Sequence, residues 1–149
     1  MDTTHWTAPV PATPARRDAI LELLQRSDLP LEGVAEHLHD FLAVEDAGRV
    51  VGVVGVERYG DDALLRSLAV DPSCRAAGLG TRLTEALIAR SHRAGVRRLY
   101  LLTTTAEEFF AHRGFVRITR TDVPPSVRGS VEFREACPES ATVMVRALE

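Results

Sequence analysis

Apolar residues near the start of the chain recur at helical intervals. Ile20 and Leu24 lie one turn apart in a predicted helix over residues 13–27, which opens with a Thr-Pro pair typical of a helix start. A second, shorter helix is predicted over residues 31–41, where apolar positions again recur every three or four residues. Residues 1–12 contain two prolines, Pro9 and Pro11, and predict an irregular arm or a poor edge strand.

The middle of the chain alternates apolar runs with tight turns. Residues 49–59, RVVGVVGVERY, are apolar on both faces, as expected of a strand inside a covered sheet. The other predicted strands cover 41–45, 63–70, 96–104, 115–118 and 141–148, and further helices cover 81–94 and 106–113. Residues 123–138 are predicted to be irregular, with at most one helical turn. The pattern predicts one α/β (α+β) domain over residues 1–149.

A glycine pair lies between the strand 63–70 and the helix 81–94, in the stretch Arg75-Ala-Ala-Gly78-Leu-Gly80. The first amides of a helix have no intrahelical acceptor, and the helix dipole adds positive potential there. Glycines let a phosphate approach that backbone closely. The spacing matches neither G-x-G-x-x-G nor a P-loop. Two interpretations stay open from these residues: a phosphate site, or a tight turn made by two glycines.

Composition narrows the class of protein. The chain has 149 residues, of which 45% are apolar and 26% charged, as in an ordinary soluble domain. A net charge of −3 without a basic block argues against general binding to nucleic acid or membrane. No apolar run approaches the roughly 20 residues of a membrane span, and the start lacks a secretory signal, so we expect a cytoplasmic protein. Cys74 and Cys137 form no metal-binding motif, and we expect packing residues and no metal.

Two motifs carry a resemblance to a known family. Residues 75–80 fit the signature Q/R-x-x-G-x-G/A, and TTTAEEFFAHRGF carries a later aromatic pair followed by Gly-Phe. In these motifs and their separation the chain resembles the GNAT N-acetyltransferases over residues 13–148. The resemblance implies a mixed central sheet of about six to seven strands flanked by about four helices. It also implies acetyl-CoA as co-substrate, with its pyrophosphate at the glycine turn.

The same likeness implies how acetyl-CoA is held. Strand 64–70 would splay from strand 98–103, and the pantetheine arm would enter the gap. The backbone of Leu68 and Val70 would bind the arm, and an amide near Leu68 would polarise the thioester carbonyl, a catalytic role. An acceptor amine would attack directly, relying on proximity and orientation. The residues implied in cofactor binding are Leu68, Ala69, Val70, Arg75, Ala76, Ala77, Gly78, Leu79, Gly80, Thr81, Thr103 and Phe110.

The proton-transfer groups depart from the family pattern. Phe110 stands where many members carry a tyrosine that protonates the CoA thiolate, and Thr103 stands where many carry asparagine. Water, another side chain or release of the thiolate itself would have to serve. For the base, Glu57 is the first choice, because it ends an apolar strand next to the expected cleft. The alternative is a solvated carboxylate or a partner for Arg58.

Three residues are candidates for binding the acceptor. Arg66 interrupts an apolar strand beside the expected acetyl position, with Ser67 next to it, and a guanidinium binds oxyanions with a bidentate fork. It could equally point away from the sheet or pair with an acid. His37 lies in the second helix, which lines the acceptor side in many relatives, and the alternative is a surface histidine.

Within the superfamily, the chain is most similar to the arsenic-resistance N-acetyltransferases, in stretches such as ERYGDDALLRSLAV and LYLLTTTAEEFF. VEFREACPESA is also similar to small amino-acid N-acetyltransferases related to N-acetylglutamate synthase. Both imply that the acceptor is a small-molecule amine, the α-amine of a small acidic amino acid or analogue. Another small-molecule or protein amine acceptor, or a non-catalytic acetyl-CoA sensor, stays open. A homodimer through the final strand, 141–148, is a further expectation of the likeness.

Overall fold

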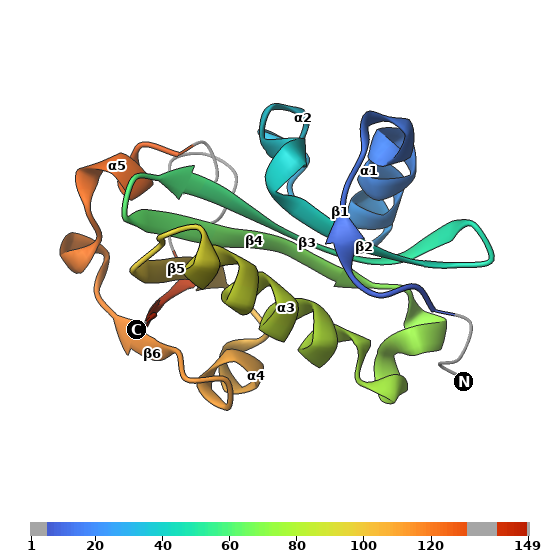
Figure 1. Cartoon of the computed structure of the whole chain (residues 1–149). Coiled ribbons are helices and arrows are strands. Elements are labelled where there is room, and N and C mark those ends of the chain that lie inside the picture. Colours follow the sequence, from blue (N-terminus) through green and yellow to red (C-terminus); the bar gives the residue numbers. More distant parts are fainter. Residues whose placement is uncertain (1–5, 131–139, 149) are drawn as a thin grey trace.

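A computed structural model describes residues 6–130 and 140–148 of the chain. They form a mixed seven-stranded sheet with the order β1-β2-β3-β4-β5-β7-β6 (Figure 1). The strands are β1 (Val10–Pro11), β2 (Phe41–Asp46), β3 (Arg49–Tyr59), β4 (Asp62–Val70), β5 (Arg98–Thr103), β6 (Val116–Ile118) and β7 (Thr142–Ala147). All neighbouring pairs are antiparallel except β4 and β5, which are parallel. The predicted fold class and strand number are confirmed.

Within the described residues five α-helices accompany the sheet, most of them short. They are α1 (Arg17–Arg26), α2 (Val34–His37), α3 (Leu79–Arg93), α4 (Glu107–Ala111) and α5 (Pro125–Arg128). Short 3₁₀ segments precede α1, follow α2, precede α3 and precede α5, at Pro14–Arg16, Leu38–Asp40, Pro72–Ala77 and Arg120–Asp122. None of the helices in the described ranges is both long enough and apolar enough to cross a bilayer.

The helices cover the two faces of the sheet separately. Figure 1 shows α1 and α2 on one side and α3 and α4 on the other. Ile20 and Leu24 of α1 pack with Phe41 and Val53 on the first side. On the second side the core includes Leu83 and Leu87 of α3 with Val54 and Leu101 of the sheet. This double cover explains why β3 is apolar on both faces.

The sheet divides where β4 meets β5. Only three residue pairs join these strands, from Asp62↔Arg98 to Leu64↔Tyr100. Beyond Leu64, β4 continues along β3, whereas β5 pairs with β7 through to Thr103. The two strands therefore diverge, and the edge of β4 that faces β5 is left without a strand partner over residues 65–70. The predicted separation of these strands is confirmed.

Three sequence expectations need correction. The helix α3 begins at Leu79, so Gly80 belongs to its first turn. The second helix ends at His37, because Phe41 is taken into β2. The final strand is not an edge of the sheet: β7 lies between β5 and β6, and Val143 to Val145 pair on both sides. Dimerisation through an exposed final strand therefore loses its basis, whereas dimerisation as such stays a prediction.

Candidate active site

A cleft lies between the diverging strands. Its inner cavity, about 430 Å³, is lined by Arg66, Ser67 and Phe110 among others. Its outer cavity, about 650 Å³, reaches Arg75 and Gly78 at the glycine turn. Residues that line both cavities are Leu29, Leu68, Thr104, Thr105 and Ala106. The two cavities therefore form one continuous cleft from the start of α3 to the middle of β4.

The glycine turn at the outer end is held by a side-chain cap. Asp71 Oδ1 accepts hydrogen bonds from the hydroxyl (2.8 Å) and the backbone amide (3.0 Å) of Ser73. These bonds hold the pKa of the Asp71 carboxyl below its ordinary value. Gly78 then takes a φ of 81°, a left-handed conformation that glycine adopts without strain. The turn thus delivers the N-terminus of α3 to the cleft.

The open side of this turn has space and positive charge. A β-carbon built at Gly78 would find no atom within 4 Å. Arg75 lies on the same turn, and its Nε donates to the carbonyl of Val70 at 3.3 Å. The first amides of α3 lack intrahelical acceptors. The side chain of Leu79 is buried in the core, so this predicted residue could offer only its backbone. The predicted residues that line the outer cavity, in an arrangement suited to a phosphate group, are Leu68, Ala69, Val70, Arg75, Gly78, Gly80 and Thr81.

Glu57 and Arg66 form a buried ion pair on the α1–α2 side of the sheet. Arg66 Nη1 donates to Glu57 Oε2 at 2.6 Å, and the two side chains are 0% and 3% exposed. Arg66 also donates from Nε to Ser67 Oγ (2.9 Å) and from Nη2 to the Pro30 carbonyl (3.2 Å). Ser67 has a φ of 63° at an irregularity in the β3–β4 register. Of the alternatives for Arg66, pairing with an acid is the one confirmed.

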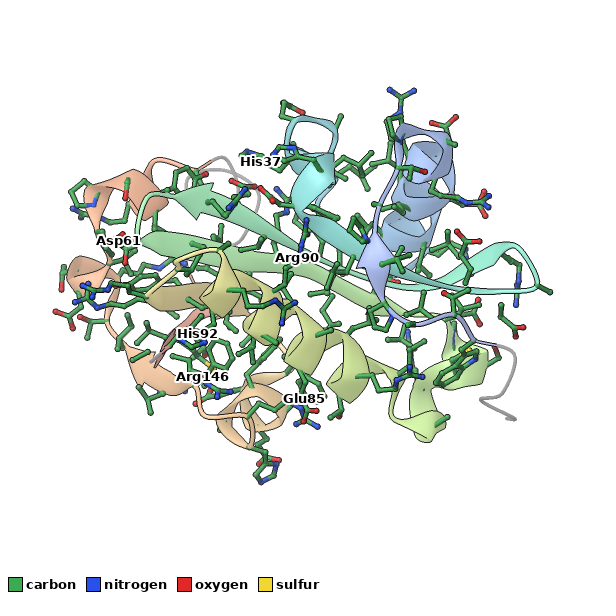
Figure 2. All side chains as sticks on the ribbon, viewed as in Figure 1. His37, Asp61, Glu85, Arg90, His92 and Arg146 are labelled. Atoms are coloured by element: carbon green, nitrogen blue, oxygen red, sulfur yellow. The ribbon has the colours of Figure 1, made fainter. Side chains whose placement is uncertain are left out.

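Two further side chains approach the other oxygen of Glu57. The Tyr59 hydroxyl donates to Oε1, and Nε2 of His37 lies 3.6 Å from it. Figure 2 shows His37 on α2, on the face of the sheet opposite α3. The sequence analysis missed Tyr59, although residues two apart on a strand share a face. The alternative pairing of Glu57 with Arg58 is wrong, because Arg58 Nε donates to Asp40 at 3.2 Å.

Aromatic residues of α4 close the cleft on the β5 side. Phe110 is buried, and its ring makes edge contacts with Phe109 and Phe115 at centroid distances of 5.1 and 5.6 Å. Thr103 Oγ1 accepts the amide of Ala106 at 2.9 Å and so fixes the turn into α4. Both predicted residues line the inner cavity. Neither the ring of Phe110 nor this bonded threonine supplies an evident acid.

Arg113 was not among the residues expected at the site, but it contacts two residues that line the outer cavity, Phe109 and Thr81. Its guanidinium lies 3.7 Å from the centroid of the Phe109 ring, and it donates to the Phe109 carbonyl at 2.7 Å and to the hydroxyl of Thr81. A single basic residue before Gly-Phe carries no signal of such contacts.

The sequence predicts no metal site. Among the described residues, no group of three or more His, Cys, Asp or Glu side chains is placed so that it could hold a metal ion. Cys74 is fully buried in the core on the α3 side, as expected of a packing residue. Cys137, and with it most of the C-terminal stretch VEFREACPESA, lies outside the described residues.

Comparisons with known proteins give consistent matches. The model of the acetyltransferase (GNAT) domain matches residues 37–117. An amino-acid acetyltransferase of Neisseria meningitidis is 32% identical over 108 residues, covering 71% of this chain and 24% of that protein. One from Ralstonia nicotianae is 33% identical over 91 residues, covering 60% of this chain and 20% of that protein. The chain thus spans about a quarter or less of the length of these curated relatives.

Solved structures match over almost the whole chain. N-acetylglutamate synthase from Neisseria gonorrhoeae, complexed with coenzyme A and L-arginine, has a TM-score of 0.81 and 25% identity, covering 97% of this chain and 34% of that one. Rv2747 from Mycobacterium tuberculosis, in complex with CoA and NLQ, has a TM-score of 0.82 and 23% identity, covering 96% and 100%. The second likeness concerns the fold alone.

Proposed function

The chain belongs to the GNAT acetyltransferase family, and on this premise we propose that it is an acetyl-CoA-dependent N-acetyltransferase. Its acceptor in this proposal is the α-amine of a small acidic amino acid or an analogue of one. The observation that carries the proposal is the continuous cleft, which runs from the glycine turn at the start of α3 to Arg66, the buried partner of Glu57.

The residues at the outer end fit acetyl-CoA. The N-terminus of α3, the open space at Gly78 and the charge of Arg75 suit a pyrophosphate. The unpaired edge of β4 offers backbone groups to an extended chain lying between β4 and β5, where Leu68 lines both cavities. Acetyl-CoA would supply an activated acetyl thioester at that point. The similar N-acetylglutamate synthase complexed with coenzyme A supports this assignment.

The inner cavity fits a small anionic acceptor. At about 430 Å³ it lies in the size range of small-molecule sites. Arg66 lines this cavity, and it donates from Nη1 to Glu57 and from Nη2 to the Pro30 carbonyl at 3.2 Å. A substrate carboxylate in the cavity would be attracted by the positive charge of this guanidinium, because hydrogen bonds between ionised groups are the stronger ones. The names of the relatives, amino-acid acetyltransferase and N-acetylglutamate synthase, favour the same class. Phosphinic and arsenical analogues belong to it on chemical grounds.

Proton removal from the acceptor ammonium is assigned to Glu57 together with His37. The carboxylate is 2% exposed as a residue, whereas the His37 side chain is 29% exposed. Their 3.6 Å separation is that of an ion pair once His37 is protonated. A proton accepted by the buried Glu57 could therefore pass to solvent through the half-buried imidazole of His37. Leaving-group protonation falls to water, because Phe110 has no proton to give.

The test is thiol release from acetyl-CoA with glutamate, aspartate, phosphinothricin, an arsenical analogue, spermidine and an aminoglycoside as acceptors. We expect turnover with an acidic amino acid or analogue. Arg66→Lys keeps the charge but loses the fork, and should raise the KM for that acceptor at least tenfold. Arg58→Lys, at an arginine that lines neither cavity, is the matched control. Turnover of spermidine or the aminoglycoside would instead indicate that the acceptor is a cationic amine. Binding of CoA without turnover of any acceptor would favour a non-catalytic sensor.

A further inference from the structure

Arg113 joins α4 to the first turn of α3. Its Nη1 donates to the carbonyl of Phe109 at 2.7 Å, and its Nη2 donates to Oγ1 of Thr81. Its own carbonyl accepts a hydrogen bond from Nη1 of Arg146 at 2.6 Å, which ties this part of the chain to β7. Two elements that are far apart in the sequence are therefore connected through one guanidinium, directly behind the outer cavity.

The bond to Thr81 has a chemical consequence. A hydroxyl that accepts from a guanidinium must use its own proton elsewhere. Thr84, one turn later, donates its proton back to the carbonyl of Gly80 at 2.8 Å. Thr81 has no such acceptor in the described part of the chain, and it lines the outer cavity beside Gly78 and Gly80. Its hydroxyl is thus free to donate into the cleft, and the adjacent cation makes it a stronger donor.

The charge on Arg113 is itself unbalanced. Within residues 6–130 and 140–148 no carboxylate forms an ion pair with it, and its Nε is buried there without a hydrogen-bond partner. By comparison, Arg117 on the neighbouring strand has a bidentate partner in Glu107. A half-buried cation lacking an acidic partner adds positive potential at the start of α3, where an anion would be held.

We propose that Arg113 is a positioning residue for the phosphates of acetyl-CoA: it commits the Thr81 hydroxyl to donating into the outer cavity and raises the positive potential there. The inference rests on the proposed use of acetyl-CoA. Arg113 also covers one face of the Phe109 ring, whose edge approaches Gly80. Losing the guanidinium would therefore release both the hydroxyl and the aromatic wall of the site.

Calorimetric titration with CoA tests the proposal without requiring turnover. Arg113→Gln should weaken CoA binding about tenfold, the size of one hydrogen bond to a charged group. Thr81→Val should have a similar effect and Thr81→Ser little. Combined, Thr81→Val and Arg113→Gln should lose less than the sum of the separate losses, because they remove one shared interaction. Arg93→Gln, at an exposed arginine near the other end of α3, should leave the affinity within twofold.

A second ligand separates positioning from general stability. Acetyl-pantetheine lacks the pyrophosphate, so its KM should be the same for the wild type and for Arg113→Gln. Equal losses with CoA and acetyl-pantetheine, or an unchanged CoA affinity, would overturn the proposal. If Arg113→Gln does not fold, the contrast between Thr81→Val and Thr81→Ser decides instead. A wild-type protein that binds no CoA would contradict the proposed function itself, which is a different result.

Discussion

The guanidinium of Arg66 lies 2.6 Å from the carboxylate of Glu57, and both side chains are shielded from solvent. The two residues stand on adjacent strands, and the register places Gly55 opposite Arg66 and Leu64 opposite Glu57. Breaking such a pair from one side leaves an uncompensated buried charge, which costs much more than removing both charges together.

Glu57→Gln should therefore lower the free energy of unfolding by about 3–5 kcal/mol. The double variant with Arg66→Met should recover most of that loss, because no unpaired charge remains. Neither protein should acetylate an amino acid, since one lacks the proposed base and the other also lacks the cation. Urea unfolding and thiol release measure the two properties separately. Recovery of activity in the double variant would contradict a chemical role for the pair.

The glycines of the turn should respond differently to alanine. Gly78 has a φ of 81°, so Gly78→Ala should cost about 1–2 kcal/mol of stability through backbone strain. Gly80 lies in the first helical turn, where an added β-carbon would meet Phe109 at 3.7 Å, an ordinary contact. Gly80→Ala should therefore be neutral or slightly stabilising. Thermal unfolding of both variants checks the contrast, and equal losses would show that crowding, not backbone conformation, controls the turn.

Asp71 should make the glycine turn sensitive to acid. Hydrogen bonds from Ser73 hold the pKa of its carboxyl below 3.8, so its contribution to stability is present above that value and is lost as the pH falls through the lower, folded-state pKa. Asp71→Asn keeps an acceptor oxygen but loses its charge, so it should cost about 1 kcal/mol at pH 7 and show a shallower decline in stability below pH 4. Denaturant titrations between pH 2 and 7 measure this difference.

Phe110 should contribute packing and not proton transfer. Phe110→Leu removes the edge contacts with Phe109 and Phe115 and should cost about 1–2 kcal/mol of stability. Because neither side chain can donate a proton, kcat should stay within about twofold across the pH range. Steady-state kinetics together with thermal unfolding test this. A kcat that fell far more steeply than stability would assign the ring a direct part in catalysis.

Much of this arrangement could be predicted because its signals are local. The apolar run of β3 and the motif from Arg75 to Gly80 each act over a few consecutive residues, and both lie where we expected. The bond between Glu57 and Arg66 depends instead on a register that shifts near Ser67, a serine in a conformation more typical of glycine. No sequence pattern around position 67 predicts that shift in register.

Contacts between elements that are far apart in the sequence could not be predicted either. Arg113 and Thr81 are 32 positions apart, and they meet only because α4 packs beside the start of α3. The place of β7 inside the sheet likewise depends on pairing between strands that are not consecutive: β7 pairs with β5 on one side and with β6 on the other. Tyr59 is the exception, since its position two residues after Glu57 was already sufficient to place both on one face.

The three residue pairs between β4 and β5 also affect how the molecule holds together. They are the only ladder contacts, among the described strands, between a four-stranded half and a three-stranded half of the sheet. With the cleft unfilled, the backbone amides of the two halves should exchange with solvent at separate rates. A ligand spanning the cleft would supply the missing lateral bonds and make the halves open as one unit. Ligand binding in the cleft should therefore also hold the two halves of the sheet together.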